Sequence, residues 1–337
     1  FGTTATAFTV GATAVTWGTI GGFLITTAVT TWALSALAPR PEVPVRNSLD
    51  NVKEATGPFD IVYGEVRKGG VITFLETTDR IGYKVFKDDY LHMVIVLAGH
   101  EVEEIGDIYL NDEKVTLNSS GFVTTSRWSN PSQVIRIKKH LGSPNQLADP
   151  DLVAETSADE NFRGRGIAYL YVRMDWDKDI FSSGTPTVTA MVKGKKCWDP
   201  RVGAFAWTDN SALCIRDYLS EEYGANSKQS PSSLQSPSWS IAANVCDTNI
   251  TLRNGGTEKR YTMNGILSTA NSPRENLQKM LTTCGGTLFW GQGQWQFKAG
   301  YLPAGPYVSF NADDLRSGID LVTKNSRKEN FNEVTGV

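Results

Sequence analysis

The chain has 337 residues, of which 40% are hydrophobic and 20% charged, and a formal net charge of −3. This length is enough for about two domains, each with its own core. The near balance of charge argues against a basic surface for nucleic acid, and the composition is neither collagen-like nor broadly disordered.

The charges are distributed unevenly, because residues 1–39 contain no Lys, Arg, Asp or Glu. This segment predicts one hydrophobic helix over about residues 8–37, followed by a stiff Pro linker to about residue 45. The run 20–37 would span about 27 Å as a helix, close to the thickness of a bilayer core. A membrane anchor is therefore one interpretation, but there is no basic region of the kind that opens a signal peptide.

Small residues recur at every fourth position of this segment, at Ala14, Gly18 and Gly22. This spacing lets helix backbones approach closely, so we expect the helix to pack against copies of itself in a larger assembly. The chain begins at Phe1 and ends in the strand-like "FNEVTGV", and we expect it to be a fragment of a longer protein.

Residues 59–195 carry mostly strand signals. "FDIVYGEV", Lys68-Gly69-Gly70 and "VITFLETT" predict a hairpin with a glycine turn, and "YLHMVIVLAG" predicts a buried central strand. "SQVIRIKKH", "IAYLYVRMDW" and "TPTVTAMVKGK" predict further strands. The polar stretch 141–163 predicts a loop with one short helix.

The acidic stretch "GHEVEEIGDIYLND" (99–112) begins like an H-E-x-x-H zinc-protease helix, but Glu104 stands where the second histidine would be. Val102, Ile105, Ile108 and Leu110 instead predict a strand, and Asn111-Asp112 a turn after it. We expect the carboxylates of this stretch to lie on a solvated strand face or at a subunit contact. The residues in question are Glu101, Glu103, Glu104 and Asp107.

After Pro200 the pattern becomes mixed α and β. "DNSALCIRDYLSEEYG" predicts a helix capped by Asp209 or Asn210, and "SPSWSIAANVCD" predicts a second short helix. "NSPRENLQKMLTTCGG" predicts a helix that begins with a Ser272–Glu275 capping box and Pro273 at its first position. "TLFWGQGQWQFKAG" predicts a hairpin around a Gly-Gln-Gly turn. The fold class is therefore mainly β with α+β parts.

Cysteines occur at 197, 214, 246 and 284, with no C-x-x-C pair, which is a poor pattern for a zinc knuckle or a redox motif. We expect buried free thiols, with a long-range disulfide as the alternative.

Several blocks resemble lambda-type tail tip attachment proteins, the host-specificity protein J family. They are "LAGHEVEEIGDIYLND", "ALCIRDYLSEEYG", "ANVCD", "SPRENLQKMLTTCGGTLFWGQGQWQFKAG" and "RKENFNEVTGV". The resemblance covers about residues 55–337 and rests on the order of the blocks. The sequence departs from the family at Gly99-His100, where Glu-Gly is usual, and at Glu104, where Gly is frequent. None of the blocks carries catalytic chemistry.

The resemblance implies the central hub of a siphovirus-like phage tail: a homotrimer that closes the tail tube and forms the channel for DNA ejection. It implies tube-like hub β domains, with a first discontinuous domain at 46–87 plus 166–199 and an inserted small β domain at 88–165. A second hub domain, α+β, would occupy 200–337 and continue beyond it. The uncharged N-terminal segment 1–45 would precede them.

The resemblance also implies partners within the virion. These are the distal tail protein or other tail tip rings, the C-terminus of the tape-measure protein, and a host receptor bound by a C-terminal part outside this chain. We hypothesise that three N-terminal helices plug the lumen or enter the host membrane, and that DNA only passes through the hub. In such a hub we expect some of the carboxylates of Glu101, Glu103, Glu104 and Asp107 to face either the channel or a neighbouring ring.

Two other functions remain open. Asp175 and Asp177 could act as the carboxylate pair of a polysaccharide hydrolase, but "MDWDKDIF" is better explained as a strand end leading into a loop. The chain could also be a membrane-anchored module that binds carbohydrate or a cell surface, with Trp198, Trp207, Trp290 and Trp295 stacking on sugars. We predict no catalytic residue, no cofactor and no metal site.

Overall fold

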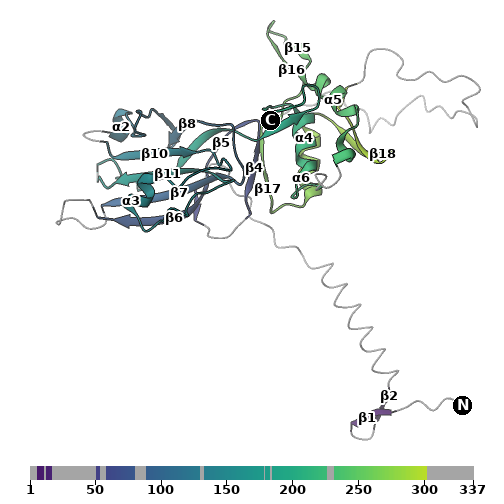
Figure 1. The fold of residues 1–337 in the computed structure, drawn as a ribbon, viewed down its shortest axis with the longest axis horizontal. Helices are drawn as coiled ribbons and strands as arrows, with labels where there is room; N and C mark the ends of the chain where they lie inside the picture. The colour runs from purple at the N-terminus through teal and green to yellow at the C-terminus, as the bar shows by residue number, and fades with distance from the viewer. Residues whose placement is uncertain are drawn as a thin grey trace, which may run out of the picture.

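The computed structural model describes residues 6–10, 13–16, 51–53, 58–79, 89–129, 133–177, 179–182, 184–225 and 231–301. The fold is mainly β, with several small antiparallel sheets and a few short helices (Figure 1). Among the residues so described, no helix is both long and apolar enough to cross a bilayer.

Near the N-terminus, β1 (Thr6–Val10) and β2 (Thr13–Thr16) form an antiparallel hairpin. Residues 8–10 and 13–16 are therefore extended, where the sequence predicted the first turns of a helix. The remainder of that predicted helix, the proline linker and residues 302–337 lie outside the described residues.

Two sheets enclose the first core. The five-stranded sheet has the order β10-β11-β7-β6-β3 and the four-stranded sheet the order β5-β12-β8-β9. The first comprises β10 (Ile135–His140), β11 (Ala168–Asp175), β7 (Tyr90–Ala98), β6 (Val71–Thr78) and β3 (Val52–Lys53). The second comprises β5 (Glu65–Lys68), β12 (Val188–Lys193), β8 (Glu104–Leu110) and β9 (Glu113–Val115).

The apolar run at 90–98 is the buried central strand that was predicted. β7 pairs with β6 on one side and with β11 on the other, and most of its side chains are buried. The predicted turn at Asn111-Asp112 is also confirmed, since both residues have positive φ between β8 and β9. Two short helices, α2 (Ser126–Ser129) and α3 (Pro150–Glu155), lie in the connections, and α3 confirms the helix predicted within 141–163.

The predicted hairpin across Gly69-Gly70 is wrong. β5 pairs with β12 and β6 pairs with β7, so the two strands belong to different sheets. The chain passes from one sheet to the other at these glycines, and a Cβ on Gly70 would lie 2.4 Å from the Val96 carbonyl oxygen. Only glycine allows this close approach of two backbones.

Residues 88–165 contribute β7, β8, β9 and β10 to the same two sheets as the flanking strands. Their buried side chains share one core with those of β11 and β12. Among the described residues, the segment that was expected to form an inserted domain therefore packs mainly against strands of the flanking segments. The boundaries of the four predicted segments stay a prediction.

Helices and a hairpin build the second core. α4 (Ser211–Ser220), α5 (Ser238–Asp247), α6 (Pro273–Thr282) and a 3-10 turn (Pro231–Leu234) pack with β18 (Thr287–Gly291) and β19 (Gln294–Lys298). Asn210 caps α4, and the Ser272–Glu275 capping box of α6 is present as predicted. The four cysteines are all buried here as free thiols.

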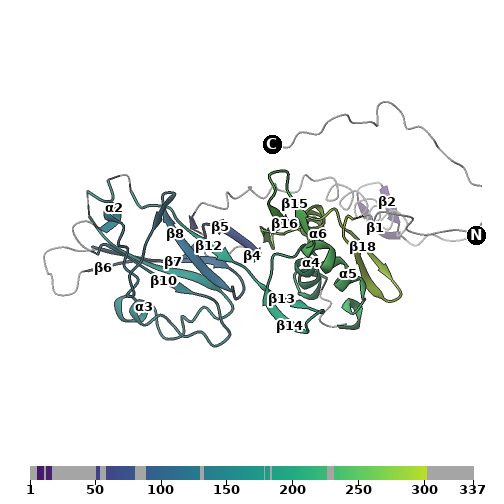
Figure 2. The same ribbon diagram turned by 90° about the horizontal axis from the view of Figure 1, so that it is seen from above.

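One strand joins the two cores. β4 (Asp60–Tyr63) pairs with β17 (Gly265–Ser268), some 200 residues further along the chain. Val62 packs in the first core, whereas Ile61 and Tyr63 pack in the second. Figure 1 shows the two units on either side of β4 and β17, and Figure 2 shows them on either side of β4.

Two further hairpins complete the described fold. β13 (Lys196–Asp199) pairs with β14 (Ala204–Trp207), and β15 (Asn249–Thr251) pairs with β16 (Thr257–Lys259). The first of them continues directly from β12 and therefore connects the two cores along the chain.

Candidate functional site

The predicted carboxylate row lies on the outer side of β8 and of the bend before it. All four carboxylates are exposed, whereas Ile105 and Ile108 of β8 are buried. Three of them pair with lysines: Glu103 with Lys196 at 3.1 Å, Glu104 with Lys193 at 2.6 Å, and Asp107 with Lys114 at 2.7 Å. Such exposed pairs are screened by solvent and contribute little to stability. The surface is thus of mixed charge, and its role as channel wall or ring contact stays a prediction.

His100, which begins the acidic stretch, is held by backbone groups. Its Nε2 accepts from the Val62 N–H at 2.9 Å, so Nδ1 carries the proton and donates to the Glu101 carbonyl oxygen at 2.7 Å. Burial lowers the pKa of His100 to about 4, and Lys195 and Lys68 nearby act in the same direction. His100 is therefore a neutral residue that supports β4.

No metal-binding arrangement accompanies this histidine in the part of the chain that the structure describes. There, no group of three or more His, Cys, Asp or Glu side chains is placed to hold a metal ion. Of the pair considered for hydrolysis, Asp177 accepts from the backbone N–H groups of Asp179 and Ile180, at 2.8 and 3.3 Å. That carboxylate closes a turn, in agreement with a strand end leading into a loop.

A buried polar network lies where the two cores meet. Lys195 Nζ donates to Asp217 Oδ2 at 2.7 Å and to Glu221 Oε1 at 2.6 Å, and Tyr63 Oη donates to the same Asp217 oxygen at 2.7 Å. Burial raises the pKa of Asp217 although Lys195 opposes it. For Lys195, burial acts to lower the pKa, but Asp217 and the other partners outweigh it and raise the pKa.

A second polar network covers the outer face of the five-stranded sheet. Glu155 of α3 accepts from Arg136 at 2.7 Å and from Arg173 at 3.2 Å. The Tyr171 hydroxyl lies 3.2 Å from Glu155 and 2.9 Å from Nδ1 of His92. Burial lowers the pKa of His92 to about 4. Neither network follows a motif, and both join residues far apart in the sequence, so the sequence analysis missed them.

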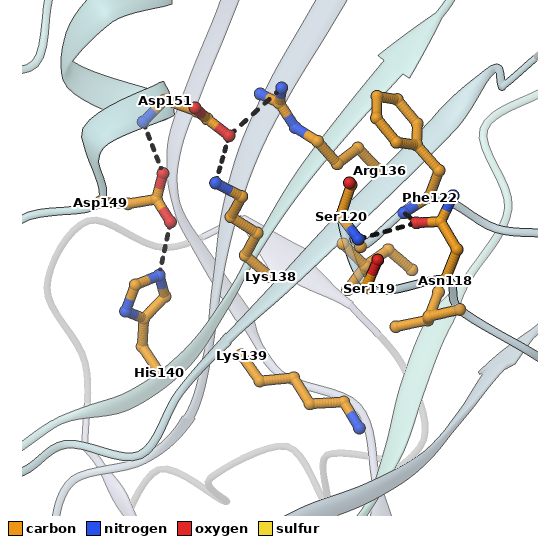
Figure 3. A pocket seen from close by; sticks show the side chains of 13 residues that line it. Asn118, Ser119, Ser120, Phe122, Arg136, Lys138, Lys139, His140, Asp149 and Asp151 are labelled. Carbon is orange, nitrogen blue, oxygen red and sulfur yellow. Dashed lines mark hydrogen bonds and ion pairs between the residues drawn. The ribbon is translucent and has the colours of Figure 1, made fainter.

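Beside this second network lies an open groove of about 630 Å³, which we call the β10 groove (Figure 3). Its lining comes from three segments, namely residues 117–122, residues 136–140 of β10, and Asp149 with Asp151 at the start of α3. His140 Nε2 and Asp149 Oδ2 lie 2.7 Å apart, and the His140 ring stacks on Tyr169 with centroids 4.4 Å apart. Asp151 pairs with Lys138 and with Arg136.

The tryptophans considered for sugar stacking lie on two separate hairpins. Trp198 and Trp207 belong to β13–β14, and Trp290 and Trp295 belong to β18–β19. Trp290 is 57% exposed and makes an edge-to-face contact with Trp295, with centroids 5.3 Å apart. Trp207 donates through Nε1 to the Gly64 carbonyl oxygen at 3.3 Å, so its indole N–H has a partner within the protein.

The small residues predicted for helix packing are not brought together by the described structure. Ala14 belongs to β2, and Gly18 and Gly22 lie outside the described residues. Their role at a trimer axis stays a prediction.

Comparison with known proteins leaves the family unassigned. No protein-family model matches the chain, and no curated protein matches it. Among solved structures, the chain is similar to one chain of a structure described as "virion of native gene transfer agent (GTA) particle". The two are 16% identical with a TM-score of 0.43, and the match covers 85% of this chain. It spans 65% of the length of the other chain.

Proposed function

We propose that this chain is a structural, non-enzymatic component of a phage tail tip: a subunit of the homotrimeric central hub. The hub would close the tail tube, link it to the host-recognition apparatus and form the channel for DNA ejection. The observation that carries the proposal is the order of the sequence blocks that resemble tail tip attachment proteins over residues 55–337. The first four of these blocks coincide with packed elements, namely β8, α4, α5, α6 and the β18–β19 hairpin.

Two features of the described residues support this proposal. The first and second cores share β4, which gives a subunit with two adjoining units of the kind a hub requires. The exposed face of β8 carries carboxylates beside lysines, and a channel that passes DNA is favoured by a wall that does not grip phosphates. We place Glu101, Glu103, Glu104 and Asp107 on that wall or at a contact with a neighbouring ring.

The proposal is tested by the mass and shape of the full chain in mild detergent, measured by light scattering and negative-stain microscopy. We expect trimers that form rings with a central hole. A species that stays monomeric when mixed with assembled tail tubes would contradict the hub.

The proposed location is the virion, and the proposed partners are the tail tip rings, the tape-measure protein and, through a part outside this chain, the host receptor. Residues 1–39 would plug the lumen or enter the host membrane. Deleting them from the phage should abolish DNA delivery while leaving adsorption intact. Normal delivery by the deleted phage would remove this part of the proposal.

A second candidate is a membrane-anchored module that binds carbohydrate or a cell surface. It is favoured by the exposed aromatic side chains of the β18–β19 hairpin, Phe289 at 51% and Trp290 at 57%. Exposed aromatic rings are suited to contact a partner surface. A monomer whose glycan binding is lost in Trp290→Ala would favour this candidate over the hub.

A further inference from the structure

Asparagine is followed by glycine at two places in the chain, Asn254-Gly255 and Asn264-Gly265. In such a pair the backbone nitrogen of the glycine can attack the side-chain carbonyl carbon of the asparagine, because glycine has no Cβ to hinder the approach. The attack requires the backbone of the asparagine to rotate until the two atoms meet. The two pairs are identical as dipeptides, so the surrounding structure decides which of them can reach this conformation.

Asn254 lies in the turn of an exposed hairpin. Figure 1 shows β15 and β16 projecting from the second unit, and all residues from 253 to 259 are exposed. Two backbone bonds close the turn: Gly255 N–H donates to the Leu252 carbonyl oxygen at 2.9 Å, and Leu252 N–H donates to the Gly256 carbonyl oxygen at 2.7 Å. Oδ1 of Asn254 accepts from the Gly256 N–H at 3.1 Å. Rotation of Asn254 therefore breaks a few exposed hydrogen bonds and leaves both cores packed.

Asn264 lies where the two cores meet. Its Oδ1 accepts from the Glu65 N–H at 2.8 Å, which holds the side chain against the start of β5. The next residue, Gly265, pairs with Tyr63 of β4, and Tyr63 is fully buried. Rotation of Asn264 into the reactive conformation would separate β17 from β4 and disturb the strand that joins the cores. Such an opening costs far more free energy than the opening of an exposed turn.

We propose that Asn254 is a site of spontaneous deamidation, whereas Asn264 stays intact in the folded chain. A water molecule or hydroxide ion removes the proton of the Gly255 N–H, and this nitrogen forms a bond to Cγ of Asn254. The bond from Cγ to the side-chain nitrogen breaks, and that nitrogen takes up a proton and leaves as ammonia. Water then opens the cyclic imide at either of its two carbonyl carbons, which gives aspartate or isoaspartate.

The products change the hairpin in two ways. Both add a negative charge to the turn, and isoaspartate also adds a carbon atom to the main chain between Leu252 and Gly256. The closing bonds of a short hairpin depend on the length of its loop, so isoaspartate should weaken the pairing of β15 with β16. The modification goes beyond the hub proposal and does not depend on it, because the reaction needs neither a partner nor a second subunit.

The test follows both asparagines in the full chain, freshly purified in mild detergent and then incubated in mildly alkaline buffer. Peptide mapping by mass spectrometry measures the conversion at each position and separates aspartate from isoaspartate. The same incubation in urea is the matched control, because it compares the two dipeptides without the fold. Gly255→Ala is a second control, since it places a Cβ beside the attacking nitrogen in an exposed turn.

In the folded chain, Asn254 should convert at least about tenfold faster than Asn264, because the rate follows the population of the open conformation. The product should be a mixture of aspartate and isoaspartate. In urea the two positions should react at similar rates, and Gly255→Ala should slow the conversion of Asn254 in both conditions. Equal rates in the folded chain, or an intact Asn254, would overturn the proposal. Aspartate without isoaspartate, or unchanged conversion in Gly255→Ala, would overturn the attack by the Gly255 nitrogen.

Discussion

Apart from the β4–β17 pair that joins them, the two cores of this protein differ in how far apart along the chain their paired strands lie. In the first core, β12 pairs with β5 and β8, across about 120 and 80 residues. In the second unit, β18 pairs with β19 across a two-residue turn, and α4 and α6 begin at side-chain caps. Local signals in the sequence therefore specify much of the second unit, whereas the first depends on which distant strands meet.

The two units also differ in which reactive side chains they contain. The three histidines of the chain are at 92, 100 and 140, and the four cysteines lie between 197 and 284. His92 and His100 are buried within or at the edge of the first unit, and all four thiols are buried in the second core. The pH dependence of unfolding therefore reports on the first core, and the rate of thiol labelling reports on the second.

The largest effect is expected from Trp239→Ala, in the second core. Trp239 is fully buried, stacks on Phe297 with centroids 5.1 Å apart, and donates to the Trp295 carbonyl oxygen at 3.2 Å. Its removal should lower the free energy of unfolding by about 3–5 kcal/mol. Urea unfolding and the rate of labelling by a thiol reagent measure the effect, and labelling should become faster.

Ile241→Ala is the control for this variant, because Ile241 lies on the same helix and is 65% exposed. It should change the free energy of unfolding by less than about 0.5 kcal/mol. Equal destabilisation by the two variants, or unchanged labelling in Trp239→Ala, would argue against a second core built around α5.

Asp217→Ala tests whether the two cores depend on the network between them. The change leaves the half-buried Lys195 with one carboxylate, Glu221, and the buried Tyr63 hydroxyl without its acceptor, so we expect a loss of about 3 kcal/mol. The exposed pair of Glu104 with Lys193 offers a matched comparison, and Glu104→Ala should leave the stability nearly unchanged, because solvent screens an exposed ion pair. Thermal unfolding of both variants decides the matter, and similar losses would show that the buried network contributes no more than a surface pair.

Acid should destabilise the first unit. His92 and His100 have a pKa of about 4 in the folded state because burial disfavours the charged form, and an unfolded histidine titrates near 6.5. Between these values the unfolded chain binds more protons. The free energy of unfolding should therefore fall as the pH decreases from about 6.5 to about 4, by on the order of 3 kcal/mol for each histidine.

Urea unfolding at a series of pH values measures this dependence. His92→Gln should make it shallower by about one proton over the same window, since one depressed histidine is removed. A pH dependence identical to that of the unmodified chain would mean that the pKa of His92 is the same in the folded and unfolded states.

The smallest effect is expected from removing the N-terminal cap of α6. Ser272→Ala removes the side-chain oxygen that accepts from the Glu275 N–H at 3.3 Å and should cost about 1 kcal/mol. Ser272→Thr keeps the hydroxyl and should lose less. Thermal unfolding of the two variants shows the difference, and equal losses would mean that packing, rather than the cap, defines the start of α6.

The sequence predicted those parts of the candidate sites that depend on neighbouring positions. Alternation of apolar and acidic residues correctly predicted that Glu101, Glu103, Glu104 and Asp107 are exposed. Their lysine partners come from β9, β12 and β13, and no local pattern indicates them. The β10 groove could not be predicted at all, because its three segments become neighbours only when β10 lies between α3 and the loop at 117–122.

By itself, the sequence determined the mainly β character, the buried run at 90–98, the turn at Asn111-Asp112, and the caps of α4 and α6. Each of these depends on the backbone preferences, side-chain hydrogen bonds or hydrophobicity of a few adjacent residues. Only the tertiary structure decided that β5 and β6 belong to different sheets, and that β4 joins two cores. The local sequence of a strand does not specify which other strand it pairs with. The partner is decided by the arrangement that buries both faces of each strand.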